Sequence, residues 1–297
     1  MTESDSLTGN HTAAAEKWRR SELATFLRSR RARLSPSEHG LAETRRRRTS
    51  GLRREEMAML LDVSVSWYTK LEQGLAVSAS PRLLGRIADV LLLSPVEREQ
   101  LLRLGLEDPG SHVSGLAIPG DAAGVMASVQ AIIDAMHYAP AFLLTARADY
   151  IACNRAARAF FGDFETFPGQ GNQLMALFLD DAVRRVLPNW RESARIQVAM
   201  FRTGFARAMH DPRWQDLVAT LLEKSPEFRA LWEDYELPSG TSRDLDYHLP
   251  NGEQGHFRHF TFFADLDGQL RVEVFNPIGE ATLQWMIGCV DGFRGGG

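Results

Sequence analysis

The segment LDVSVSWYTKLEQG, residues 61–74, places hydrogen-bonding side chains on one side of an expected helix. Tyr68 and Leu71 share the face that a helix bundle buries. The opposite face then consists of Val65, Ser66, Trp67, Thr69 and Lys70. A lysine on such a face reaches the O6 and N7 atoms of guanine, so we expect Lys70 to contact a base edge in the DNA major groove. The valine and the tryptophan also fit a packing role against neighbouring helices.

The residues around this helix have the spacing of a helix-turn-helix. Ala58 is small where two helices must cross closely, and Asp62 with Val63 occupies the turn four residues later. The hydroxyl of Ser64 caps the second helix, whose free N-terminal amides suit a phosphate. Gly74 supplies the left-handed residue that ends this helix. The spacing therefore predicts a DNA-reading motif.

Basic residues are concentrated before this motif. The whole chain of 297 residues has a net charge of −4, but residues 17–54 carry 13 basic and three acidic residues. Residues 1–110 sum to +3 and the remainder to −7, which indicates one half that faces nucleic acid and another with a different task. The candidate phosphate contacts are Arg45, Arg46, Arg47, Arg48, Arg53 and Arg54. The alternative is a solvated loop and, for the last two, a role in capping and solubilising their helix.

The N-terminal half is expected to be all helix. An apolar face begins a first helix at Trp18, and short helices are expected at residues 53–61 and 65–73. A further apolar stripe covers residues 83–91, and the SPVE sequence of residues 94–97 is a capping box that starts a fifth helix. Small polar residues predict a disordered tail over 1–15. A five-helix bundle is thus expected over residues 16–107.

The C-terminal half is expected to mix strands and helices. The Pro-, Gly- and Ser-rich residues 108–121 predict a linker. Residues 141–154 predict two strands around a polar turn, and alternating residues between 243 and 275 predict further strands. A long helix is expected from Trp190 to Met209, with an apolar stripe that fits a core more readily than a pocket wall. The second domain, residues 122–290, is therefore expected to be α+β.

Several segments, in order, resemble one family. Residues 18–104 resemble the XRE (Cro/cI-type) helix-turn-helix domain, and RRRRTSGLRREEMAMLLDVSVSWYTKLEQG is similar to the MmyB-like regulators. The segments CNRAARAFFGDF, LFLDDAVRRVLPNW, DPRWQDLVATLLEKSPEFRALW and YHLPNGEQG are similar to that family's C-terminal PAS-like domain. Three positions differ: Asp62 replaces a usual glycine, Cys153 a common tryptophan and Tyr235 a common histidine. Aspartate tolerates the left-handed backbone better than most residues, so we expect the turn to survive.

The resemblance implies a one-component transcription regulator with a PAS-like sensor for an apolar small molecule, fatty-acid-like in some members. Its expected partners are double-stranded DNA, this apolar molecule and a second copy of the chain, and no cofactor is expected. One recognition helix reads few base pairs, so we expect a homodimer on an inverted repeat. The expected ligand-contacting residues are Phe142, Leu144, Cys153, Phe201, Phe205, Phe260 and Phe262. The polar end of the ligand is expected at Arg155, Trp190 or His248.

Other classes of function have less support. The sequence lacks a GxSxG, a phosphate loop and a paired metal motif, so an enzyme is not expected. His248, His256 and His259 fit no metal-ligand spacing and predict exposed strand histidines. Two distant cysteines, no membrane-length apolar run and no signal pattern predict a cytoplasmic protein. The main alternative is a DNA-binding regulator whose C-terminal domain recruits a protein or dimerises without a ligand. A closed apolar cavity favours sensing, and a filled core with an exposed apolar patch favours recruitment.

Overall fold

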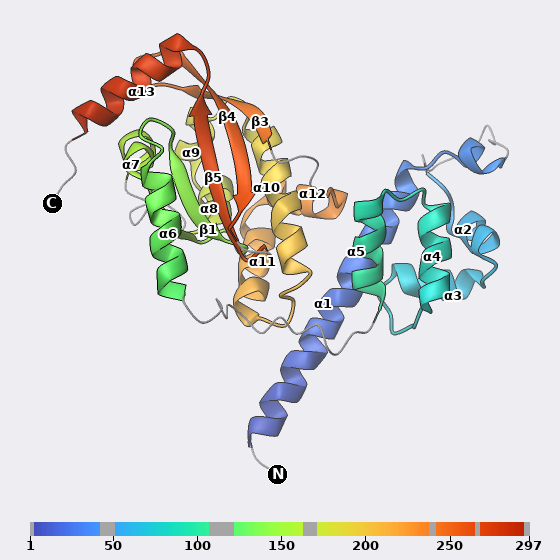
Figure 1. The fold of residues 1–297 in the computed structure, drawn as a ribbon. Coiled ribbons are helices and arrows are strands. Elements are labelled where there is room, and N and C mark those ends of the chain that lie inside the picture. Colours follow the sequence, from blue (N-terminus) through green and yellow to red (C-terminus); the bar gives the residue numbers. More distant parts are fainter. Residues whose placement is uncertain are drawn as a thin grey trace. The chain divides into compact units, whose positions relative to one another are not determined.

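The computed structural model describes residues 3–41, 51–106, 122–162, 171–237, 242–264 and 268–293. The chain divides into two compact units. The helical unit comprises residues 1–113, 205–217 and 230–237, and the sheet unit comprises 114–204, 218–229 and 238–297. Figure 1 shows the elements of each in chain order. The expected linker, residues 108–121, lies outside the described residues.

The first five helices of the chain belong to the helical unit. They are α1 (Glu3–Arg33), α2 (Arg54–Leu61), α3 (Val65–Glu72), α4 (Pro81–Val90) and α5 (Pro95–Gly105), with a short 3-10 helix (Pro36–His39) after the first. The expected capping box forms at the start of α5, where the Ser94 N–H donates to the Glu97 carboxylate at 2.9 Å. The expected helices are thus confirmed, although residues 3–15, expected to be a disordered tail, belong to α1.

The turn between α2 and α3 has the geometry that the motif requires. Asp62 adopts the left-handed conformation, with φ 53° and ψ 52°, and so confirms that this turn survives without glycine. The Val63 N–H donates to the carbonyl of Ala58 at 3.0 Å and closes the end of α2. After α3, Gly74 has φ 70°, and a Cβ there would lie 3.1 Å from the carbonyl oxygen of Arg20. Both the backbone angle and the close approach of α1 therefore favour glycine at this position.

Five antiparallel strands form the sheet of the sheet unit, in the order β2-β1-β5-β4-β3. Their bounds are β1 (Ala141–Thr145), β2 (Tyr150–Cys153), β3 (Ser242–His248), β4 (Gln254–Phe263) and β5 (Leu270–Pro277). The remaining helices are α6 (Ala122–Asp134), α7 (Arg155–Phe161), α8 (Gln173–Leu179), α9 (Asp181–Val186), α10 (Trp190–Phe205), α11 (Pro212–Lys224), α12 (Pro226–Asp234) and α13 (Glu280–Gly292). The α+β class expected from the alternating pattern is confirmed.

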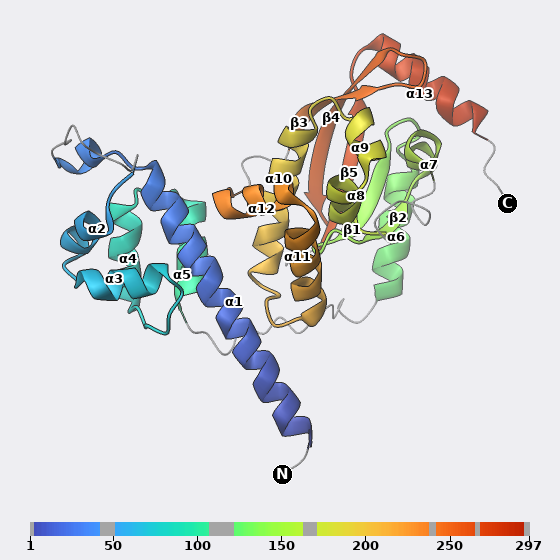
Figure 2. The same cartoon turned by 180° about the vertical axis from the view of Figure 1, so that it is seen from behind.

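The two faces of this sheet have different neighbours. One face carries the apolar residues Leu143, Val272 and Val274 beneath Val129 and Ile133 of α6. The opposite face is covered by α8, α9 and α10, of which α8 and α9 lie in front of the strands in Figure 2. Because successive strand residues point to opposite faces, neighbouring residues in the sequence serve two different layers.

Asn154 positions the helix that follows β2. Its side-chain oxygen accepts from the N–H groups of Ala141 and Ala157, at 3.0 and 2.9 Å. Its amide donates to the carbonyls of Ile133, Met136 and Ala139 at 2.8–3.0 Å. A buried amide with all these partners fixes the direction of α7, and α7 ends in Phe160 and Phe161.

Candidate nucleic-acid interface and ligand pocket

The recognition helix α3 presents the polar face expected from the sequence. The hydroxyl of Ser64 accepts from the Trp67 N–H at 3.1 Å and so caps the helix as expected. Tyr68 and Leu71 are buried in the helical unit. Val65, Ser66 and Lys70 are exposed, and Trp67 and Thr69 are half-buried. The structure therefore brings these five residues together on one accessible side of α3.

A buried carboxylate holds α3 against its neighbours. Glu72 is fully buried, and its carboxylate accepts from the guanidinium groups of Arg31 in α1 and Arg54 in α2, the latter at 2.7 Å. Arg28 also donates to the Glu72 carbonyl at 3.0 Å. Burial, followed by the charge of Glu72, raises the pKa of Tyr68 well above its ordinary value, so the phenol stays neutral. These bonds tie α3 to both α1 and α2.

The expected phosphate contacts separate into three groups. Arg54 is engaged by Glu72 and positions the motif. Arg53 directly precedes α2, and its backbone N–H donates to the Glu56 carboxylate at 2.7 Å. The residue is exposed, so its guanidinium is accessible to a phosphate. The four loop arginines, Arg45 to Arg48, lie outside the described residues.

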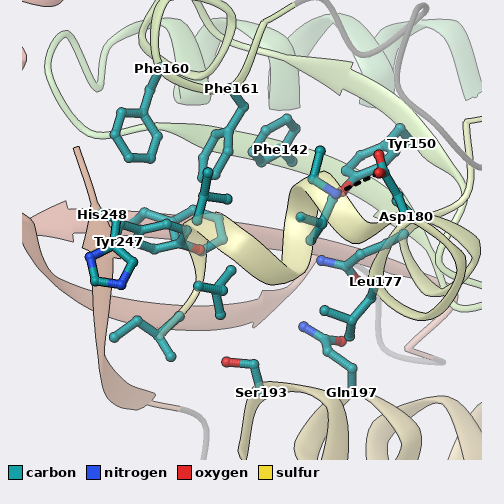
Figure 3. A pocket seen from close by; sticks show the side chains of 18 of the residues that line it. Phe142, Tyr150, Phe160, Phe161, Leu177, Asp180, Ser193, Gln197, Tyr247 and His248 are labelled. Atoms are coloured by element: carbon teal, nitrogen blue, oxygen red, sulfur yellow. Dashed lines mark hydrogen bonds between the residues drawn. The ribbon is translucent and has the colours of Figure 1, made fainter. Parts of the chain in front are cut away.

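The sheet unit contains a pocket of about 370 Å³ with a mostly apolar wall. Phe160 and Phe161 of α7 and Phe142 of β1 form one side, and Ser193 and Gln197 of α10 lie on the opposite side (Figure 3). The full lining consists of Phe142, Tyr150, Phe160, Phe161, Gln173, Ala176, Leu177, Asp180, Ala182, Val183, Val186, Leu187, Ser193, Gln197, Arg243, Leu245, Tyr247, His248, Pro250 and Phe275. Burial raises the pKa of Tyr150 and of Tyr247, so both phenols are neutral.

Two polar groups of the pocket lining have no partner among the described residues. The Nε of Arg243 and the Oγ of Ser193 are buried and make no hydrogen bond with this part of the chain. Arg243, Leu245 and Tyr247 are every second residue of β3, so all three lie on the face of the sheet that borders the pocket. Burial lowers the pKa of Arg243 from its ordinary value, and the charge of Glu273 opposes this shift. An arginine has so high an ordinary pKa that the side chain remains a cation.

A buried polar cluster lies on the same face of the sheet. The Glu273 carboxylate is fully buried and lies 3.3 Å from Arg271 Nε and 3.4 Å from His259 Nε2. The side-chain amides of Gln173 and Gln197 donate to it at 2.7 and 3.2 Å. Burial alone would raise the pKa of Glu273, but Arg271, His259 and Gln173 together hold it well below the ordinary value. The carboxylate is therefore ionised and paired with Arg271, whereas Arg243 feels the charge of Glu273 without a hydrogen bond to it.

One expectation about the histidines is wrong. His248 and His256 are exposed on their strands as expected, but His259 is fully buried, with its ring centroid 4.7 Å from that of Phe275. Burial lowers the pKa of His259, against the opposing influence of Glu273, so the ring is neutral near pH 7. No group of three or more His, Cys, Asp or Glu side chains within the described ranges could hold a metal ion.

Only part of the expected ligand set lines this pocket: Phe142 and His248 do so. Leu144 and Cys153 belong to the adjacent buried core, where the cysteine is a small apolar residue as expected. Arg155 donates to two carbonyls near the end of α13. The indole of Trp190 donates to the Leu177 carbonyl at 2.8 Å, so this side chain positions the pocket wall without lining it.

The other expected ligand contacts lie elsewhere. Phe201 is fully buried, and Phe205 belongs to the helical unit, where it packs against Trp214 and Trp232. Phe260 and Phe262 stack on each other at 5.9 Å on the sheet face that lies opposite the pocket. Sequence reasoning also missed Arg243 and Ser193. The only signal for Arg243 was its place in the alternating strand pattern, where a charge normally marks the solvent side.

A capped recognition helix and a pocket in a separate unit define a DNA-binding regulator with a ligand-binding domain. Residues 22–101 match the model of the helix-turn-helix domain. Residues 125–286 match the model of the MmyB-like transcription regulator ligand binding domain. This second match spans more than half of the chain, so the protein belongs to the MmyB-like transcription regulators, which are not enzymes. No curated protein matches the chain. None of the helices in the described ranges is both long and apolar enough to cross a bilayer.

Proposed function

We propose that this regulator binds an inverted-repeat operator as a homodimer and responds to an apolar molecule that carries an anionic head group. The observation that supports the ligand class is the guanidinium of Arg243, whose Nε has no hydrogen-bond partner among the described residues, in a mostly apolar pocket. A buried N–H donor without an acceptor is unfavourable, and a carboxylate placed against the guanidinium would form charge-assisted hydrogen bonds. The hydroxyl of Ser193, which also lines the pocket, offers a further donor.

The remaining lining fits an acyl chain. Phenylalanine, leucine and valine side chains surround a volume within the range of ordinary small-molecule sites. Burying a chain there yields about 0.8 kcal/mol for each methylene, so a medium-length chain gives useful affinity after the cost of binding. Asp180 is the one acidic side chain of the lining, and its carboxylate accepts from the Ala182 N–H at 2.7 Å (Figure 3). The anionic head group is therefore expected at Arg243, and a fatty-acid-like ligand meets these requirements.

Ligand binding can be tested with one chain length and three head groups. We expect the protein, stripped of bound lipid, to bind dodecanoate in calorimetric titrations more tightly than dodecanol or dodecyltrimethylammonium. Arg243→Met should weaken dodecanoate binding at least tenfold and leave dodecanol binding within twofold, because only the charged pair is lost. Arg185→Met, which removes an exposed arginine of α9 outside the pocket lining, is the matched control. If the wild-type protein bound all three compounds with equal affinity, the proposed preference for an anionic head group would be wrong.

Dimeric reading of DNA follows from the size of the recognition surface. The exposed face of α3 contacts only a few base pairs, so useful specificity needs two half-sites about one helical turn apart. For regulation, the ligand must bind one arrangement of the dimer more tightly than another, since equal affinity shifts nothing. Footprinting of the operator should show two symmetric half-sites. A single half-site bound by a monomer would contradict this part of the proposal.

The alternative function, protein recruitment without a ligand, has one observation in its favour. Phe262 is 52% exposed on the outer face of the sheet, beside the half-buried Phe260. Under this alternative, no ligand shifts the melting temperature or the DNA affinity, and a partner protein covers the two rings. The titrations described above separate the two functions.

A further inference from the structure

An apolar row crosses the face of the sheet that lies opposite the pocket. Val272 and Val274 of β5 are buried on this face beneath α6. Their partners across the ladder are Phe262 and Phe260, which continue the row onto β4. Figure 1 shows that α6 does not extend over this strand. The two rings stack nearly parallel, with an interplanar angle of 21°. Stacked aromatic rings left open to solvent mark a surface for a partner.

The uncovered flank of α6 extends this apolar surface. Gln130 donates to the Cys153 carbonyl at 3.2 Å, so its side of α6 faces β2. At 100° per residue, Val125 and Ile132 lie on the other flank, toward β5 and β4. They are 36% and 58% exposed. Val125, Ile132, Phe260 and Phe262 are called the outer apolar surface below.

Charged pairs border the outer apolar surface in two columns. Asp244 of β3 pairs with Arg258 of β4 at 2.7 and 3.0 Å, and Asp246 of β3 lies 2.7 Å from His256 of β4. These partners face each other in the ladder, so the acidic column lies on β3 and the basic column on β4. A two-fold axis that is parallel to the strands and runs between β3 and β4 places the acids of one copy opposite the bases of another. The surface is therefore complementary to itself, as an isologous interface requires.

We infer that the outer apolar surface binds a second copy of this chain, with Phe260 and Phe262 forming the apolar part of the contact and the charged residues of β3 and β4 continuing it along the strands. The inference rests on the proposed function, because it supplies the contact for the dimer that reads an inverted repeat. The open edge of β3 is a poorer contact, since its charged side chains discourage strand pairing between copies. The contact is face to face, which leaves the pocket on the other side of the sheet.

The chain offers a matched pair of variants for the test. Phe262 and Phe263 are adjacent phenylalanines, 52% and 56% exposed, that point to opposite faces of β4. In sedimentation equilibrium of the full chain, the wild type should be a dimer. Phe262→Ser should raise the dimer Kd at least tenfold, and Phe263→Ser should change it less than twofold. Ile132→Ser, on α6, should weaken the dimer in the same direction and provides a second variant if the first does not fold.

Charge reversal tests the orientation of the two copies. Arg258→Asp places like charges opposite each other across the two-fold axis and should weaken the dimer at least fivefold. The double variant Asp244→Arg/Arg258→Asp exchanges the charges of this pair and should restore dimerisation to within twofold of the wild type. Melting temperatures measured alongside report the contribution of these pairs within one chain, so a stability effect is not mistaken for an interface effect.

Three outcomes overturn the inference. They are a wild type that stays monomeric at all concentrations, equal effects of Phe262→Ser and Phe263→Ser, and a double charge variant as weak as the single one. The proposed function fails separately. A dimer that binds no anionic lipid and responds to none contradicts the sensor but leaves the interface intact. If Phe262→Ser, Ile132→Ser and Arg258→Asp all leave the dimer Kd unchanged, while the protein binds lipid and two half-sites, only the interface is contradicted.

Discussion

Glu72 of the helical unit and Glu273 of the sheet unit are both fully buried carboxylates, and their surroundings differ in one respect. Glu72 is neutralised by Arg31 and Arg54, which belong to the helices that flank the recognition helix. Glu273 is paired with Arg271, while a second, half-buried arginine on the same sheet face, Arg243, makes no hydrogen bond through its Nε among the described residues. Each cluster has one carboxylate and two arginines, but both arginines bond the carboxylate in the first, whereas the Nε of Arg243 makes no hydrogen bond in the second.

This difference corresponds to the task of each unit. A DNA-reading helix needs a fixed direction, and a buried carboxylate bonded to two neighbouring helices provides it. Ligand binding to a sensor must be favourable, and a guanidinium with an unused donor in the pocket can form new hydrogen bonds when an anionic ligand binds. Removing a charge should therefore have opposite effects on stability in the two clusters.

The largest effect is expected at Glu72. Glu72→Gln leaves two arginines facing a neutral amide, and breaking a buried ion pair in this way costs about 3–5 kcal/mol. Urea denaturation followed by hydrogen exchange in α1–α5 should show the loss in the helical unit. Glu99→Gln, which removes the exposed partner of Arg103, should leave the free energy of unfolding unchanged and is the control. A small effect at Glu72 would mean that packing, not this carboxylate, fixes α3.

A smaller effect is expected on DNA binding by the surface that Glu72 supports. Lys70→Ala should cost about 1–3 kcal/mol on the cognate operator and relax specificity at one base pair. Arg53→Ala should weaken all DNA sequences alike and reduce the salt slope by about one. Binding titrations at several salt concentrations, on cognate and scrambled sequences, distinguish the two results. Uniform weakening by both variants would contradict the assignment of the recognition face.

The recognition face was predictable because its information is local. Helical periodicity with Tyr68 and Leu71 fixes which side of α3 is buried, and Ser64 marks where the helix starts. The five strands were predictable for a similar reason, since alternation is visible in a short window. The left-handed backbone at Asp62 followed from the family resemblance and the known tolerance of aspartate.

The pocket was harder to predict because its information is not local. Alternation divides strand residues into two faces but does not say which face the helices cover, so Phe260 and Phe262 were expected at a pocket that lies on the other side. Phe205 continues the apolar stripe of α10, yet the end of this helix belongs to the helical unit. A charge such as that of Arg243 in an alternating strand ordinarily marks the exposed side, so its burial depends on distant packing.

The opposite sign is expected at Arg243 in the ligand-free protein. Arg243→Met replaces a half-buried cation, whose Nε lacks a hydrogen-bond partner, by an apolar side chain of similar length, and should raise the free energy of unfolding by about 1 kcal/mol. Arg54→Met should lower it, because Glu72 loses a partner. Hydrogen exchange in β4 and β5 for the first variant, and in α2 and α3 for the second, assigns each change to its unit. If both variants lowered the free energy of unfolding, Arg243 would contribute favourable interactions to the folded protein just as Arg54 does.

The smallest effect is a pH dependence confined to the sheet unit. Burial lowers the pKa of His259 in the folded protein, so the unfolded chain binds a proton more readily below the ordinary histidine pKa of about 6.5. The stability is therefore complete above about pH 6.5 and decreases as the pH falls toward the lower folded value. Glu273 adds no slope here, since its folded pKa is also lowered and its contribution is lost only in stronger acid.

His259→Gln should flatten the loss of stability between pH 7 and 5.5, whereas His248→Gln, at an exposed position, should preserve it. Denaturation series at these pH values test the prediction, and an unchanged slope in His259→Gln would mean that the buried ring is already protonated beside Glu273.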